Sequence, residues 1–250
     1  MLNRKKRVYL DAGHNYKAPD TGAVGFGLRE QDVTFQVANT IRVLLEFHGV
    51  EVGMSRWNLT DILGRTVSES LQLRTQGSNR FNADYFVSIH CNAFNGSAFG
   101  TETYIFARGG KREELASRIH RQLVGIGLRD RGVKTANFAV LRNTKAPAVL
   151  VELAFIDNMN DNDILRNRQF ELAEAVAKGI CEQFGITYQG GEGAMFKDVQ
   201  GHWAERQINE LREFGIVNGD ETGNFRPNDA ATRAEVATMI RNVVRYITGE

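Results

Sequence analysis

Two histidines and one glutamate stand where short apolar runs end. Each run is rich in aromatic and β-branched residues, which is typical of a buried β-strand. His14, His90 and Glu152 close these runs, which begin near residues 7, 85 and 148. In open α/β sheets, ligands bind outside the carboxyl ends of the strands. The pattern therefore predicts that the three side chains lie near one another at one edge of a sheet.

A fourth polar residue, Glu30, stands at the predicted start of the helix that follows the first strand. A catalytic zinc typically has three protein ligands and an open fourth position, and His14, Glu30 and His90 would supply such a set. Glu152 would remain free to act as general acid and base, which suits the hydrolysis of an amide. Two simpler explanations stay open. Glu30 would be favourable at a helix start in any case, and polar residues collect wherever strands leave a core.

Helices and strands must alternate for these residues to converge. Residues 15–27 read as a glycine-rich loop, and the helix after it ends near Gly49, a residue suited to a helix C-terminus. The patterns predict further strands at 50–54, 100–106 and 138–142 and further helices at 63–81, 111–124 and 170–184. This alternation is typical of a layered α/β domain.

The composition is that of an ordinary globular protein. The chain has 250 residues, a net charge of +1 and a pI of about 7.8. It therefore lacks the strong overall positive charge that would indicate nucleic-acid binding. No apolar run approaches the roughly 18 residues of a membrane span, and the start lacks a signal-peptide core. We therefore expect synthesis in the cytoplasm and, for any role outside the cell, release without a cleaved signal. Cys91 and Cys181 match no metal spacing, and we predict two buried free thiols.

The last quarter of the chain has a different character. Residues 189–194 read as a flexible linker between a first domain, 1–188, and a small all-α module, 195–250. Two helices are predicted in this module, at about 203–214 and 232–247, the second capped by Thr232 with Glu235. Two helices make a marginal core. We therefore expect the module to pair with copies of itself or with the first domain.

The motifs of the first domain, taken together, resemble the zinc-dependent N-acetylmuramoyl-L-alanine amidases of the Amidase_3 family. The similarity extends from about residue 6 to 185, and its main motifs lie at 11–14, 20–23, 88–92, 131–134 and 149–158. The resemblance implies an α/β/α domain with a mostly parallel central sheet. It also implies zinc on His14, Glu30 and His90, with Glu152 as the catalytic acid and base. We further predict that Arg74 and Asn92 contact the substrate.

The module after residue 195 resembles a single S-layer homology domain. The matching segments are 196–199, 201–204, 215–219, 225–228 and 232–235. The resemblance implies binding of a secondary cell-wall polymer, and Arg233 and Trp203 are the predicted contacts, since a guanidinium suits an anionic group. A structural explanation competes, in which Trp203 and Phe225 fill the small core.

The predicted function is that of a peptidoglycan hydrolase. The resemblance implies cleavage of the amide between the lactyl group of N-acetylmuramic acid and L-alanine of the stem peptide, by a phage endolysin or a mother-cell lysis enzyme. The expected partners are peptidoglycan and a wall polymer, with neither nucleic acid nor membrane. Two alternatives stay open: a wall-binding protein without catalysis, and a zinc peptidase or deacetylase acting on peptidoglycan.

Overall fold

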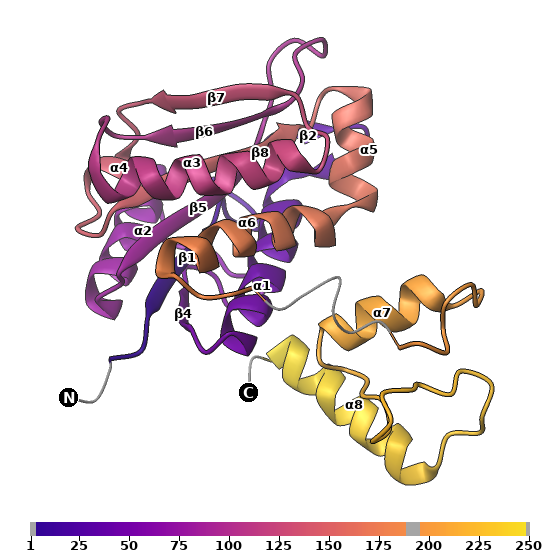
Figure 1. Ribbon diagram of the computed structural model, residues 1–250. Helices are drawn as coiled ribbons and strands as arrows, with labels where there is room; N and C mark the ends of the chain where they lie inside the picture. Colours follow the sequence, from indigo (N-terminus) through magenta and orange to yellow (C-terminus); the bar gives the residue numbers. More distant parts are fainter. Residues whose placement is uncertain (1–3, 189–195, 249–250) are drawn as a thin grey trace. The chain divides into compact units, whose positions relative to one another are not determined.

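The computed structural model describes residues 4–188 and 196–248 (Figure 1). The chain divides into two compact units, Met1–Thr187 and Tyr188–Glu250. The predicted linker at 189–194 lies outside the described residues, so the linker stays a prediction.

A six-stranded sheet forms the centre of the first unit, with the strand order β4-β1-β5-β8-β6-β7. The first four strands in this order run parallel, β6 is antiparallel to β8, and β7 is parallel to β6. The strands are β1 (Arg7–Ala12), β4 (Glu51–Met54), β5 (Tyr85–Asn92), β6 (Thr101–Ile105), β7 (Asp130–Thr135) and β8 (Ala148–Phe155). The predicted mostly parallel sheet is therefore confirmed.

Helices cover both faces of this sheet (Figure 1). On one face α1 (Glu30–Phe47), α3 (Gly110–Gly125) and α6 (Gln169–Phe184) pack side by side. On the other face α2 (Val67–Phe81) meets the short α4 (Ala139–Arg142). The remaining helix, α5 (Met159–Asn167), follows β8 and contacts α6. Strands buried from both sides need near-continuous apolar sequence, as the central strands β5 and β8 have. The predicted α/β/α layering is confirmed.

One predicted element is wrong, and another begins later than predicted. Residues 138–142 form the helical turn α4 instead of a strand, since the backbone N–H of Arg142 donates to the carbonyl of Phe138 at 2.9 Å. Its consecutive residues Val140 and Leu141 are both buried, which a strand with one covered face does not allow. The helix predicted from residue 63 begins only at Val67, because Gly64 has a φ of 70°.

Four elements were not predicted. β7 has Val133 as its one large apolar residue, and α5 has few apolar residues. A small antiparallel hairpin, β2 (Val24–Gly25) and β3 (Leu28–Arg29), lies within the glycine-rich loop. These short or polar segments carry little hydrophobic periodicity, which is the main signal available in a sequence.

The second unit contains α7 (Glu205–Glu213) and α8 (Arg233–Thr248). Its core consists of Phe196, Val199, Ile208, Ile216 and Val217, with Phe225 packed against it. The capping box of α8 is confirmed: the backbone N–H of Glu235 donates to Thr232 Oγ1, and that of Thr232 to the Glu235 carboxylate. The interpretation of Trp203 as a core residue is wrong, because this residue is 86% exposed.

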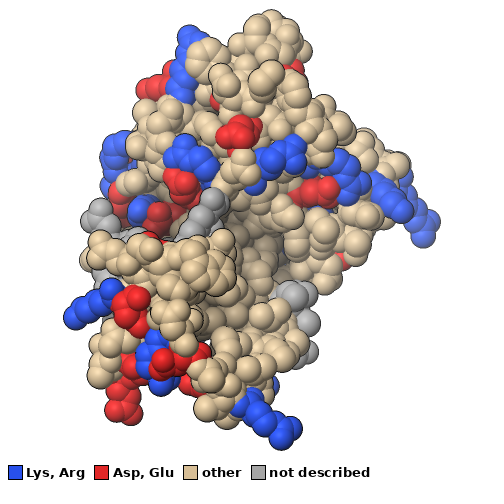
Figure 2. All heavy atoms as spheres, turned by 90° about the vertical axis from the view of Figure 1, so that its right-hand side faces the viewer, with Lys and Arg blue, Asp and Glu red and all other residues tan. Residues whose placement is uncertain are grey.

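The remaining general expectations concern charge, membranes and cysteines. On the face drawn in Figure 2, Lys and Arg are interspersed with Asp and Glu. Among the described residues, no helix combines the length and the apolar character needed to cross a membrane. Cys91 and Cys181 are both free and buried, as predicted.

Candidate functional site

The register of the sheet brings the two histidines and Glu152 together at the carboxyl ends of the parallel strands. His90 on β5 is in register with Glu152 on β8, and β1, which His14 follows, pairs in parallel with β5. Gly13 permits the close approach of the two histidines, because a Cβ at this position would lie 2.5 Å from Cε1 of His90. The backbone of His14 adopts a left-handed φ of 64°, and strained residues of this kind often mark functional sites.

His14, Glu30 and His90 form a compact group of metal-type donors, one atom from each lying within 4.8 Å of the others. Oε1 of Glu30 lies 3.2 Å from Nε2 of His14 and 3.1 Å from Nδ1 of His90. The backbone N–H groups of Ala23 and Cys91 donate to this carboxylate at 2.9 and 3.0 Å and fix its position. Donor atoms around a tetrahedral zinc stand about 3.3 Å apart. The donor types, and the distances from Glu30 to the two histidines, therefore fit zinc.

Charges within this group are strongly coupled. Burial opposes a charge on His14, but its hydrogen bonds with Asp20 and Glu30 outweigh burial and raise the pKa of the imidazole to about 9. Burial also opposes a charge on Glu30, yet His14 and His90 hold the pKa of this carboxyl well below its usual range. Glu30 is consequently ionised at neutral pH, as a metal ligand must be.

Glu152 lies beside the group as a separate carboxyl. Burial raises its pKa to about 7, and the nearby charges of Glu30 and Glu102 act in the same direction against those of His90 and His14. Its Oε2 atom is buried and has no hydrogen-bond partner among the described residues. A carboxyl with a pKa near 7 and an unpaired oxygen suits proton transfer to and from a bound molecule.

Arg74 is buried next to the site, and its contact with the substrate stays a prediction. Its side chain is 1% exposed, although it borders the cavity described below. Nη1 donates to Oδ1 of the buried Asp11 at 2.7 Å, and Nη2 donates to the carbonyl oxygen of His14 at 2.7 Å. The guanidinium therefore holds the chain segment of His14 in place and has no donor directed to solvent.

Asn92 is the last residue of β5, two positions after His90. Its Nδ2 atom donates to Oε1 of Glu102 at 2.6 Å, and its Oδ1 atom accepts the backbone N–H of Ala93 at 2.9 Å. The side chain is half-buried. Contact between Asn92 and the substrate stays a prediction.

A cavity of about 270 Å³ opens over these residues. His14, His90 and Glu152 line it on the polar side, and its apolar wall consists of Leu71, Phe138, Ala139, Val140 and Leu150. Asp20 also lines it and was not assigned a role from the sequence, although it belongs to one of the motifs. From the sequence alone, Asp20 is a single carboxylate in a loop, and only its position six residues after His14 could have indicated a role in the site.

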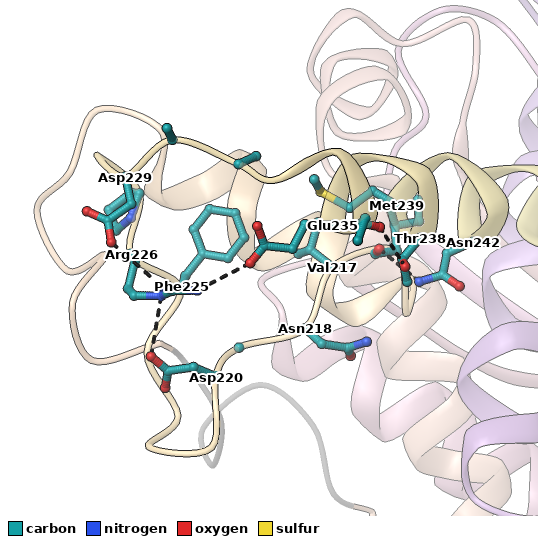
Figure 3. A pocket seen from close by; sticks show the side chains of 16 residues that line it. Val217, Asn218, Asp220, Phe225, Arg226, Asp229, Glu235, Thr238, Met239 and Asn242 are labelled. Atoms are coloured by element: carbon teal, nitrogen blue, oxygen red, sulfur yellow. Dashed lines mark hydrogen bonds and ion pairs between the residues drawn. The ribbon is translucent and has the colours of Figure 1, made fainter.

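The second unit has a larger pocket, of about 530 Å³ (Figure 3). Arg226 lies at its edge with a left-handed φ of 59°, and its guanidinium is 3.3 Å from Glu235 and 3.5 Å from Asp220. The predicted polymer contacts, Arg233 and Trp203, are exposed but do not line this pocket. No role was assigned to Arg226 from the sequence, because only the fold shows that its side chain borders a cavity.

Comparison with known proteins agrees with this arrangement. Residues 8–182 match the family model described as N-acetylmuramoyl-L-alanine amidase, and residues 196–237 match the S-layer homology domain. The N-acetylmuramoyl-L-alanine amidase CwlM of Bacillus licheniformis is 38% identical over 187 residues, which cover 72% of this chain and 70% of that protein. The endolysin of Bacillus phage SPP1 is 33% identical over 202 residues, covering 77% of this chain and 71% of that protein.

Solved structures show the same catalytic fold. The catalytic domain of CwlV, an N-acetylmuramoyl-L-alanine amidase from Bacillus (Paenibacillus) polymyxa var. colistinus, aligns with a TM-score of 0.64 and 30% identity. The alignment covers 73% of this chain and 99% of that domain. By sequence and by fold, the chain belongs to the N-acetylmuramoyl-L-alanine amidase family, with an S-layer homology domain after the catalytic domain.

Proposed function

We propose that the chain is a zinc-dependent peptidoglycan amidase that hydrolyses the amide between the lactyl group of N-acetylmuramic acid and L-alanine. The observation that carries this proposal is the convergence of His14, Glu30 and His90 beside Glu152 in a member of this family. His14, Glu30 and His90 would hold the ion. Zinc supplies Lewis acidity towards the scissile carbonyl and towards water.

Glu152 supplies the proton transfers in this proposal. It takes a proton from the attacking water as the new C–O bond forms, and it gives this proton to the amide nitrogen as the C–N bond breaks. The products are a lactyl carboxylate and a peptide with a free amino terminus on L-alanine. Burial of Glu152 favours its neutral form, so the proton can be held between the two transfers.

We infer that the S-layer homology domain retains the enzyme on the cell wall by binding a secondary wall polymer. Arg233 and Trp203 remain proposed contacts, and both side chains are exposed. Arg226 is a further candidate because it borders the pocket. The resemblance to the SPP1 endolysin and to a sporulation-specific amidase of Bacillus subtilis supports a role in lysis, by a phage or by a mother cell.

Digestion of purified cell walls tests the catalytic proposal. The full-length protein is added with zinc or with a chelator, and newly exposed amino groups are labelled and identified. We expect free L-alanine amino termini only with zinc, and neither acetate nor new reducing sugar ends. Release of acetate would indicate a deacetylase, and an amino terminus other than that of L-alanine would indicate a peptidase. Walls that stay intact in the presence of zinc would indicate a protein that binds them without catalysis.

Truncation tests the wall-binding proposal. A chain that ends at residue 189 retains the described catalytic unit and should hydrolyse soluble muramoyl-peptides at the full-length rate. We expect it to sediment less with intact walls than the full-length protein does. Equal sedimentation would show that the S-layer homology domain is not the anchor.

A further inference from the structure

A row of charged side chains crosses the sheet at the level of Glu152. Glu152 on β8 is directly opposite Glu102 on the antiparallel strand β6, and His90 is opposite Glu152 on the other side. Side chains of directly opposite residues lie on the same face of a sheet. Glu102 therefore lies on the face that carries the active site. Nε of Arg131 on β7 extends the row by donating to Glu102 Oε2 at 2.8 Å.

Glu102 is a buried acid with many donors around it. Its side chain is 3% exposed, and its carboxylate accepts hydrogen bonds from Asn92, Tyr104, Arg131 and Lys134. Burial opposes its charge, but these donors outweigh burial and lower the pKa of Glu102 to about 2. Two positively charged side chains therefore share one carboxylate, so the group formed by Glu102, Arg131 and Lys134 has a formal net charge of +1.

The two cations retain donors for another partner. The side chains of Arg131 and Lys134 are 27% and 38% exposed. Within residues 4–188 and 196–248, Glu102 is the one carboxylate that either of them contacts. An exposed cation next to a catalytic cavity is suited to binding an anionic group of the substrate.

One of these cations, Lys134, lies close to the wall of the active-site cavity. The ring of Phe138, which lines the cavity, contacts that of Tyr104 with centroids 5.2 Å apart, and Lys134 lies 6.0 Å from the Tyr104 centroid. Arg131 and Lys134 thus flank Glu152 on the β6–β7 side, whereas His14 and Glu30 lie beyond β5 on the other side.

We propose that Arg131 and Lys134 form a subsite for a carboxylate of the stem peptide, with Glu102 as the residue that positions both cations. This inference rests on the proposed amidase function. The peptide half of the substrate carries free carboxylates, whereas the N-acetylated sugars of the glycan half do not. The subsite therefore orients the substrate with its peptide over β6 and β7.

Binding of two muramoyl-dipeptides tests the subsite. They differ in one group, since the residue after L-alanine carries either an α-carboxylate or the corresponding carboxamide. Affinities are measured by calorimetry with the zinc-loaded full-length Glu152→Gln variant, so that turnover does not interfere. We expect about tenfold tighter binding of the carboxylate ligand, the range of a partly exposed charged hydrogen bond.

Substitution of Lys134 then tests whether this residue causes the preference for the carboxylate ligand. Lys134→Met in the same background should reduce the tenfold ratio to below about threefold by weakening only the carboxylate ligand. The matched control is Lys111→Met. Lys111 comes after the carboxyl end of β6, whereas Glu102 lies near the start of this strand. Equal affinities in the parent variant, no binding of either ligand, or an unchanged ratio in Lys134→Met would overturn the subsite. Wall digestion by the wild type tests the amidase function separately.

Discussion

Nδ1 of His14 lies 2.9 Å from Oδ1 of Asp20, so that Nε2 of the same ring is directed to Glu30. Asp20 is itself held, since Ser70 Oγ donates to its Oδ2 atom at 2.8 Å and Arg74 lies 3.6 Å away. These contacts outweigh the burial of Asp20 and lower its pKa to about 2. A carboxylate on the second nitrogen of a metal-binding histidine fixes the orientation and the tautomer of the ring.

Asp20→Asn should therefore weaken zinc binding about 10- to 100-fold, because the neutral amide no longer stabilises the required tautomer of His14. Competition with a chromogenic chelator at constant pH measures this change directly. Asp163→Asn, an exposed carboxylate on α5, is the matched control and should keep the wild-type affinity. Unchanged affinity in Asp20→Asn would show that the contact does not support the metal site.

Glu152→Gln should bind one zinc per chain while hydrolysis falls by a factor of about 10² to 10⁴, because the variant cannot accept a proton. Metal analysis and wall digestion on the same preparation separate the two effects. Glu221→Gln, an exposed glutamate of the second unit, serves as the control. Loss of zinc from Glu152→Gln would instead place Glu152 among the metal ligands.

The sequence predicted those parts of the molecule that have hydrophobic periodicity. Strand-like runs that end on polar residues indicated where His90 and Glu152 lie, and the structure brings them to one sheet edge with His14. The run at 138–142 was assigned to the wrong element, since a short apolar run fits both a strand and a buried helical turn. The polar edge strand β7 has no such run, and edge strands are often polar.

Contacts between distant loops could not be predicted in the same way. Arg74 was predicted to contact the substrate, and nothing in the sequence indicates that in the fold Asp11 neutralises its charge within the core. The carboxylates of Asp20 and Glu102 acquire partners from residues distant in the sequence, such as Ser70, which is 50 positions from Asp20. These carboxylates and their partners come together only in the folded chain.

The ion pairs of Glu102 should make stability depend on pH. The pKa of Glu102 is about 2 in the folded chain and about 4.5 without its partners, so folding favours the ionised form. This stabilisation, about 3 kcal/mol, is present above roughly pH 5 and is lost as the pH falls towards 2. In zinc-free protein, the difference in unfolding free energy between the wild type and Glu102→Gln should shrink over that range. A difference that is constant with pH would contradict the lowered pKa.

Substitutions of Phe196 and Trp203 should distinguish effects on stability from effects on binding in the second unit. Phe196 is buried in its core, so Phe196→Ala should destabilise this unit by about 3 to 5 kcal/mol. Trp203 is exposed, so Trp203→Ala should change its stability by less than about 0.5 kcal/mol. Calorimetry of the full-length chain measures both.

The same Trp203→Ala protein then tests the wall contact, since its fold is retained. In the Glu152→Gln background, which leaves the walls intact, we expect it to sediment less with them than the parent does. Full sedimentation would remove Trp203 from the polymer-binding surface and leave Arg226 and Arg233 as its candidates. Unfolding of the second unit in Trp203→Ala would instead contradict the exposed position of this side chain, because an exposed ring contributes little packing to a core.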